Sequence, residues 1–164
     1  MKLKIFGKYF LNCFLLLIPI FIWNIYFINY LPIKYSNDNW NDIPPIIEYA
    51  ENIFRFFLFV SPVIMELSLK TKLQKIGLGL YILGVIIYFL SWSAHIYFPE
   101  TVWSKSILGF MAPAYTTIIW LIGIGLIGKN SFFKIPNMSV FYIILSVCFV
   151  IVHSLHPYLI FWKL

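Results

Sequence analysis

The stretch KTKLQKIGLGLYILGVIIYFLSWSAHIYF, residues 70–98, decides the fold class of this chain. Lys70, Lys72 and Lys75 stand at its start, and the following residues 76–98 contain no Asp, Glu, Lys or Arg. A helix rises by about 1.5 Å per residue, so this apolar segment can cross the roughly 30 Å hydrocarbon core of a bilayer. Lysines directly beside such a segment are typical of the cytoplasmic flank of a transmembrane helix.

Four more apolar stretches have a similar character, and they lie before and after this one. Short connections join consecutive segments, and helices joined in this way are antiparallel neighbours. We therefore predict an all-α, polytopic transmembrane helix bundle in which residues 1–164 form a single transmembrane domain. The five predicted spans are residues 9–31, 45–69, 76–98, 107–128 and 138–162.

The composition excludes an ordinary soluble domain. Hydrophobic residues make up 62% of the 164 residues, and only 11% are charged, against about a quarter in soluble domains. The net charge of +6 comes from lysines beside apolar segments, which favours contact with lipid headgroups over nucleic acid. We expect the lipid bilayer as the partner, together with other membrane-protein subunits or a second copy of the chain, and no cofactor.

The segments between the apolar stretches alternate in charge, which predicts the orientation. With five crossings and the N-terminus inside, most lysines lie inside and the C-terminus lies outside, as the positive-inside rule requires. The frequent Ile, Asn, Lys, Phe and Tyr residues fit a bacterial cytoplasmic membrane. The predicted inner lysines are Lys2, Lys4, Lys8, Lys70, Lys72, Lys75, Lys129 and Lys134, and the outer ones are Lys34, Lys105 and Lys163.

The second span is the weakest of the five. Its uninterrupted apolar core covers only residues 56–65, between Arg55 and Glu66, and a segment this short can also be interfacial or re-entrant. Without this crossing, however, most lysines would fall outside. The lysine distribution therefore favours a helix that crosses from Pro45 to Leu69.

Small residues and prolines within the spans predict where helices approach and where backbone groups lose partners. Gly77, Gly79 and Gly84 in one span, and Gly123 in the next, mark predicted helix contacts, because small residues let backbones come close. Proline has no N–H, so Pro113 leaves the carbonyl of Gly109 without its helical donor.

Six ionisable side chains fall in the predicted outer half of the membrane, namely Glu48, Glu51, Arg55, His95, His153 and His156. Each costs at least about 2.5 kcal/mol near the centre of a bilayer, so each needs a partner or a function. One interpretation is an outward-facing polar pocket, with a histidine as base, Glu51 to orient it and Arg55 to bind an anion. The spacing favours the alternative, a neutralised Glu51–Arg55 pair that lets Arg55 lie below the headgroups. The candidate catalytic residues are His95, His153, His156 and Glu51, with Arg55 as a substrate-binding candidate.

Two of these spacings suggest pairs. Glu51 precedes Arg55 by four residues, which suits an ion pair along one helix face. His153 and His156 are three apart and point to nearly the same side, so a metal site is a weak hypothesis. The alternative is that each histidine bonds a carbonyl or hydroxyl group of a neighbouring helix.

The connection at residues 98–105 adds Glu100 and Trp103 as substrate-binding candidates if it forms a lid over the pocket. The alternative is a tight turn that Trp103 anchors at the membrane interface.

The chain contains no G-x-S-x-G, P-loop or H-E-x-x-H pattern, so two classes of function remain. The first is a small, non-enzymatic accessory or binding subunit of a membrane assembly. The second is a membrane-embedded enzyme or small carrier whose His, Glu and Arg pocket takes a lipid-interface or small polar substrate.

Overall fold

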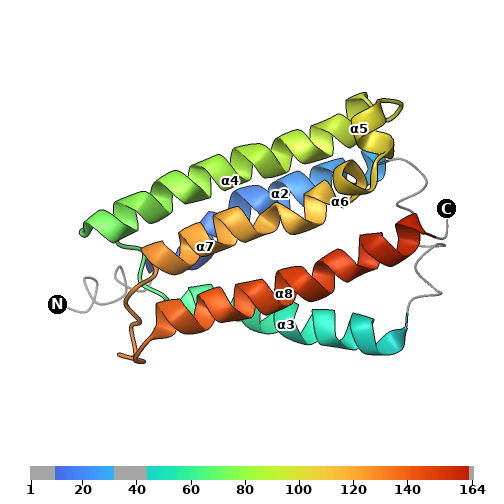
Figure 1. Ribbon diagram of the computed structural model, residues 1–164. Coiled ribbons are helices and arrows are strands. Elements are labelled where there is room, and N and C mark those ends of the chain that lie inside the picture. Colours follow the sequence, from blue (N-terminus) through green and yellow to red (C-terminus); the bar gives the residue numbers. More distant parts are fainter. Residues whose placement is uncertain (1–9, 32–43, 163–164) are drawn as a thin grey trace.

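The computed structural model describes residues 10–31 and 44–162. In these residues the regular elements are helices, accompanied by two isolated β-bridges. The long helices have roughly aligned axes and form an elongated bundle with two ends (Figure 1). Four helical segments are long and apolar enough to cross a membrane, namely Cys13–Tyr30, Lys72–Tyr97, Ile107–Ile127 and Met138–Phe161. The chain therefore has the features of a multi-pass membrane protein.

These four segments correspond to predicted spans one, three, four and five. The first consists of η1 (Cys13–Leu17), α2 (Ile18–Phe27) and η2 (Ile28–Tyr30). The second is α4 (Lys72–Tyr97), and the short helix α5 (Val102–Lys105) follows it. The third is divided into α6 (Ile107–Tyr115) and α7 (Thr117–Ile127), and α8 (Met138–Phe161) is the fourth.

The remaining helix, α3 (Pro45–Ile64), corresponds to predicted span two. It lies beside α8 along the edge of the bundle (Figure 1). At about 1.5 Å per residue, its 20 residues extend over roughly 30 Å. Its sequence is less apolar than the other four segments because it carries Glu48, Glu51 and Arg55.

The prediction that this helix continues to Leu69 was wrong, because α3 ends at Ile64. Met65 is extended, and its carbonyl accepts a hydrogen bond from the N–H of Cys13 at 3.0 Å. The N–H of Glu66 donates to the carbonyl of Asn130 at 2.8 Å, and the N–H of Leu67 donates to that of Leu11 at 3.1 Å. Long-range backbone bonds thus replace the last predicted helical turn. They join the α3–α4 connection to the start of the first segment and to the α7–α8 connection.

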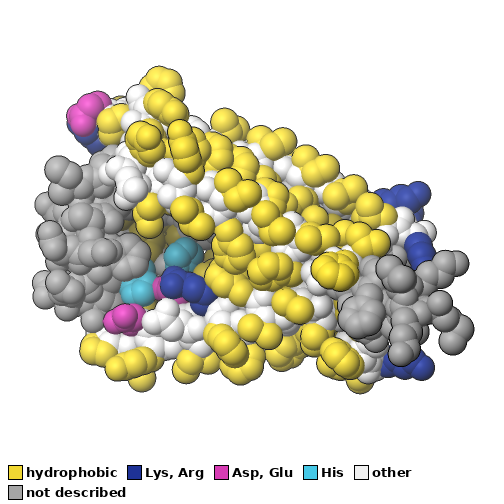
Figure 2. All heavy atoms as spheres, turned by 180° about the vertical axis from the view of Figure 1, so that it is seen from behind, with side chains coloured by type: hydrophobic (Ala, Val, Ile, Leu, Met, Phe, Trp, Pro, Cys, Tyr) yellow, Lys and Arg dark blue, Asp and Glu magenta, His cyan; other side chains and the backbone are white. Residues whose placement is uncertain are grey.

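This tied end of the bundle is also where lysines gather, and we call it the lysine end (Lys70, Lys72, Lys75, Lys129 and Lys134). Figure 2 shows basic side chains at this end and a hydrophobic surface between the two ends. Large apolar side chains on that surface are well exposed, including Ile25 at 76%, Leu90 at 63% and Ile151 at 59%. A bilayer removes the cost of leaving such a surface uncovered by protein.

The closest helix packing joins α4 to α7 through glycines. A Cβ atom at Gly123 would lie 2.6 Å from the backbone nitrogen of Tyr81, and one at Gly84 would overlap the backbone nitrogen of Trp120. Two tyrosines of α4 also reach the first segment, where Tyr81 donates to the carbonyl of Leu16 and Tyr88 to the side chain of Asn24. These contacts fix the position of α4 against two neighbours.

We expect Gly84→Ala and Gly123→Ala each to destabilise the protein by about 1–3 kcal/mol, because the added methyl group overpacks a backbone contact. Gly79→Ala is the matched control on α4, since a Cβ atom there meets nothing within 4 Å. Thermal unfolding of the purified variants in one detergent measures the difference. Equal midpoints for all three variants would contradict this packing.

Candidate functional site

The site is built around the carboxylate of Glu51, whose side chain is only 1% exposed. One oxygen, Oε1, accepts hydrogen bonds from Nη2 of Arg55 and, at 3.0 Å, from Nδ1 of His153. The other oxygen, Oε2, contacts Nδ1 of His156. We call these four residues the Glu51 cluster. It lies between α3 and α8, and Figure 2 shows basic, acidic and histidine side chains together on one face.

Helix periodicity explains why the side chains that contact Glu51 point toward it. Arg55 follows Glu51 by four residues on α3, so the two side chains share one helix face. His153 and His156 are three residues apart on α8, so both imidazoles turn toward the same neighbouring helix. The predicted Glu51–Arg55 pair is therefore present, and the predicted side-by-side histidines meet one carboxylate.

The four side chains of the Glu51 cluster differ sharply in their exposed fraction. Glu51 and His156 are buried, whereas the side chains of Arg55 and His153 are 40% and 26% exposed. Arg55 also donates from Nη1 to the side chain of Asn52, and the ring of His153 stacks on Phe149. The acceptor is thus hidden, and two of its three donors reach the surface.

The chemistry of the cluster follows from the shared carboxylate. An ionised carboxylate only accepts hydrogen bonds, so Nδ1 of His153 is the donor in its bond to Glu51. Both rings present Nδ1 to the carboxylate, which turns each Nε2 away from Glu51. A carboxylate that holds histidines in this way can orient a base or a metal ligand, and it also joins two helices.

His95 bonds to a backbone carbonyl, whereas the other two histidines contact Glu51. It is fully buried, and its Nε2 donates to the carbonyl of Gly109 at 2.7 Å. This is the carbonyl that Pro113, within α6, leaves without a helical donor. His95 therefore supplies a hydrogen bond that the proline removes, and one cavity shared by His95, His153 and His156 stays a prediction.

Glu100 and Trp103 lie around α5, at a different corner of the same end from α3 (Figure 1). Glu100 pairs with Lys105 at 2.6 Å, and both side chains are well exposed. Ser104, which is buried, donates to the carbonyl of Phe98 at 2.8 Å and fixes the turn. The structure does not bring Glu100 or Trp103 into the Glu51 cluster.

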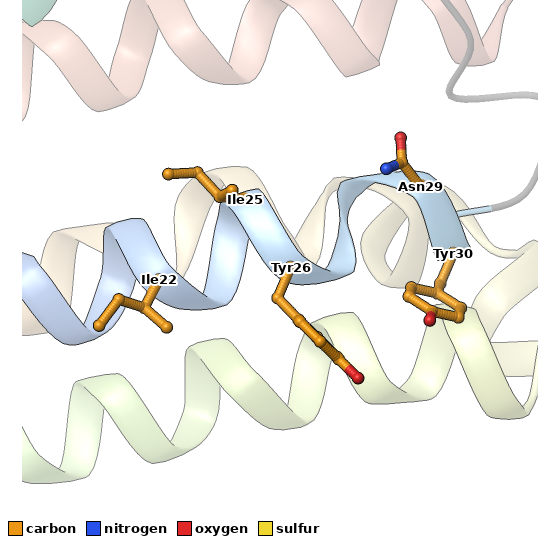
Figure 3. A pocket seen from close by; sticks show the side chains of 5 residues that line it. All are labelled: Ile22, Ile25, Tyr26, Asn29 and Tyr30. Atoms are coloured by element: carbon orange, nitrogen blue, oxygen red, sulfur yellow. The ribbon is translucent and has the colours of Figure 1, made fainter.

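Two further observations bear on binding. Among the residues that the structure describes, no group of three or more His, Cys, Asp or Glu side chains is arranged to hold a metal ion. A shallow groove lies on the surface of the first segment (Figure 3), and no predicted site residue lines it. The groove is lined by Ile22, Ile25, Tyr26, Asn29 and Tyr30.

Sequence reasoning treated Gly109 as a packing glycine with a freed carbonyl and treated His95 as part of a pocket. The signal for their pairing was present, because a buried donor and an acceptor released by proline both need partners. The register of α4 against α6 cannot be read from the sequence, however, and the pairing depends on that register.

Comparison of the chain with protein-family models, with curated proteins and with solved structures gives no match. The function therefore has to be inferred from the geometry of the site.

The pairing of His95 with the carbonyl of Gly109 can be tested with a double-mutant cycle. His95→Ala leaves a buried acceptor unsatisfied, which costs about 1–3 kcal/mol. In a Pro113→Ala background the new N–H can donate to that carbonyl, so the same His95 substitution should cost less. Thermal melting of the four proteins gives the coupling energy. Strictly additive effects would show that the proline and the histidine act independently.

Proposed function

We propose that this chain is a non-enzymatic accessory or binding subunit that crosses a membrane five times, with its N-terminus inside and its C-terminus outside. The observation that carries this proposal is how the Glu51 cluster uses its polar atoms. The carboxylate and its three donors bind one another across α3 and α8. The charged and polar side chains of this cluster thus serve a contact between two helices.

Several features of α3 support a fifth crossing. The helix is long enough for the hydrocarbon core. The residues directly after it, Met65 and Glu66, bond to Cys13 and Asn130 near the lysine end. Glu51, by contrast, contacts His153 and His156 in the second half of α8. Pairing of Glu51 with Arg55 and its contacts with two histidines lower the cost of these charged residues in a membrane.

The positive-inside rule gives the orientation of this proposal, and cysteine labelling tests it. Cysteines placed at Lys72 and Lys129 should react only with a membrane-permeant thiol reagent in intact cells. A cysteine at Lys105, in the exposed turn at the other end, should react with an impermeant reagent and serves as the control. Impermeant labelling at Lys72 or Lys129 would reject this topology.

The structural role of the Glu51 cluster predicts how apolar substitutions behave. Arg55→Leu alone leaves a buried carboxylate with less compensation, and the loss of stability can reach about 3–5 kcal/mol. Adding Glu51→Leu should recover part of that loss, because a paired charge in an apolar surrounding can be replaced by packed hydrophobic groups. Thermal melting in detergent, with co-purification of membrane partners, measures both effects.

Lys105→Leu is the control for charge removal at the same end. Its exposed pair with Glu100 should contribute no more than about 1 kcal/mol. A double variant at Glu51 and Arg55 that stays folded and keeps its partners supports the accessory role. A variant that stays folded and abolishes the biological activity of the protein favours the other class of function.

That second class, a membrane-embedded enzyme or small carrier, is favoured by one observation. Glu51 binds both histidines of α8 through Nδ1, and a carboxylate orients the base in catalytic triads in the same way. In that function His153 or His156 acts as the base, Glu51 orients it and Arg55 binds an anionic substrate at the lipid interface.

A further inference from the structure

We propose that Arg55 and His153 form a binding site for the phosphate group of a membrane lipid. The site lies at the Glu51 cluster, in the half of the bundle away from the lysine end. This inference rests on the proposed function in one respect, because a crossing α3 places the two side chains beside lipid. It adds a ligand of defined chemistry, a phosphate oxyanion, and names the residues that bind it.

The two donors are held side by side by one atom. Nη2 of Arg55 and Nδ1 of His153 both bind Oε1 of Glu51, so they lie within about 6 Å of each other, twice the length of a hydrogen bond of about 3 Å. The two side chains are therefore neighbours, and their remaining donor groups can each meet a different oxygen of one phosphate group. Glu51 therefore fixes the spacing of the site without taking part in binding.

The accessible part of the cluster consists of donors. Glu51 is buried, whereas Arg55 and His153 are partly exposed. The guanidinium group has five N–H donors in a planar fork, and the described bonds use one nitrogen toward Glu51 and one toward Asn52. The remaining edge suits a phosphate, for which arginine is a preferred ligand. Nε2 of His153 can donate a second bond when the imidazole is protonated.

The surroundings favour a lipid as the source of the phosphate. Glu51 lies in the first half of α3 and contacts His153 and His156 in the second half of α8, away from the lysine end. The long, partly exposed side chain of Arg55 can extend from there toward the headgroups. Exposed apolar side chains continue along α3 from this point, namely Ile53, Phe56, Phe57 and Val60. Figure 2 shows hydrophobic surface beside the polar cluster. A headgroup phosphate at the cluster would leave its acyl chains beside that surface.

The negative charge of Glu48 opposes the binding of an anion, so its removal provides a test in which binding should become stronger. Glu48 is exposed on α3, one turn before Glu51 and on the same helix face. Its removal should strengthen phosphate binding, because it eliminates a like charge near the ligand. The removal of Arg55 or His153 should weaken it.

Lipid retention by the purified protein tests the site. The protein is exchanged into nanodiscs of phosphatidylcholine with phosphatidylglycerol, and the phosphatidylglycerol that remains bound after detergent extraction is measured by native mass spectrometry. We expect Arg55→Gln to weaken retention about tenfold, since a charge-assisted hydrogen bond is lost. His153→Gln should weaken it less, Glu48→Gln should strengthen it, and Lys105→Gln, which removes a cation elsewhere at the same end, should leave it unchanged.

Two further arms keep the result interpretable. Arg55→Lys preserves the charge beside Glu51 but not the planar fork, so it tests the site if Arg55→Gln does not fold. Inorganic phosphate in excess should displace little of the retained lipid; full displacement, with equal affinity for free phosphate, would assign the site to the soluble anion. Retention that is the same in all variants, with normal melting temperatures, would overturn the proposal. The proposed topology would survive that outcome, because cysteine labelling tests it separately.

Discussion

A carboxylate held among apolar helices must find donors nearby, and much of this structure depends on how Glu51 finds them. It takes one donor from its own helix, Arg55, and two from α8, His153 and His156. Because these donors come from two helices, the same contacts that compensate the charge also fasten α3 to α8. At the opposite end, backbone bonds of Met65 and Leu67 hold the end of α3 in place. The most polar helix of the bundle is thus fixed at both ends.

The same constraint explains other polar contacts inside the bundle. Backbone groups within a membrane have no water to bond, so a carbonyl freed by proline needs a protein donor. His95 provides it for Gly109, and the tyrosine hydroxyls of α4 bond to Leu16 and Asn24. Glycines bring α4 and α7 close enough for their backbones to touch. Polar bonds and close packing together set the helix positions, since apolar burial alone distinguishes poorly between protein and lipid.

The distribution of exposure in the Glu51 cluster links its structural and functional interpretations. A cluster that served only to join helices could be buried throughout, but Arg55 and His153 keep part of their surface accessible. The buried acceptor arranges the exposed donors, and this arrangement suits an anion at the membrane surface. Under the proposed function, the cluster holds α3 against α8 and a lipid headgroup at the same time.

The sequence by itself determined the helical class, the apolar segments and the pairs set by helix periodicity, such as Glu51 with Arg55 and His153 with His156. These features depend on composition and on spacing within one helix, which a sequence displays directly. The end of α3 was mispredicted, because Met65 bonds to Cys13 and leaves the helix. Only the tertiary structure brought Glu51 to His153, 102 residues away, paired His95 with Gly109, and kept Glu100 and Trp103 at another corner. Those outcomes depend on the register between helices, which close glycine contacts and long-range hydrogen bonds decide.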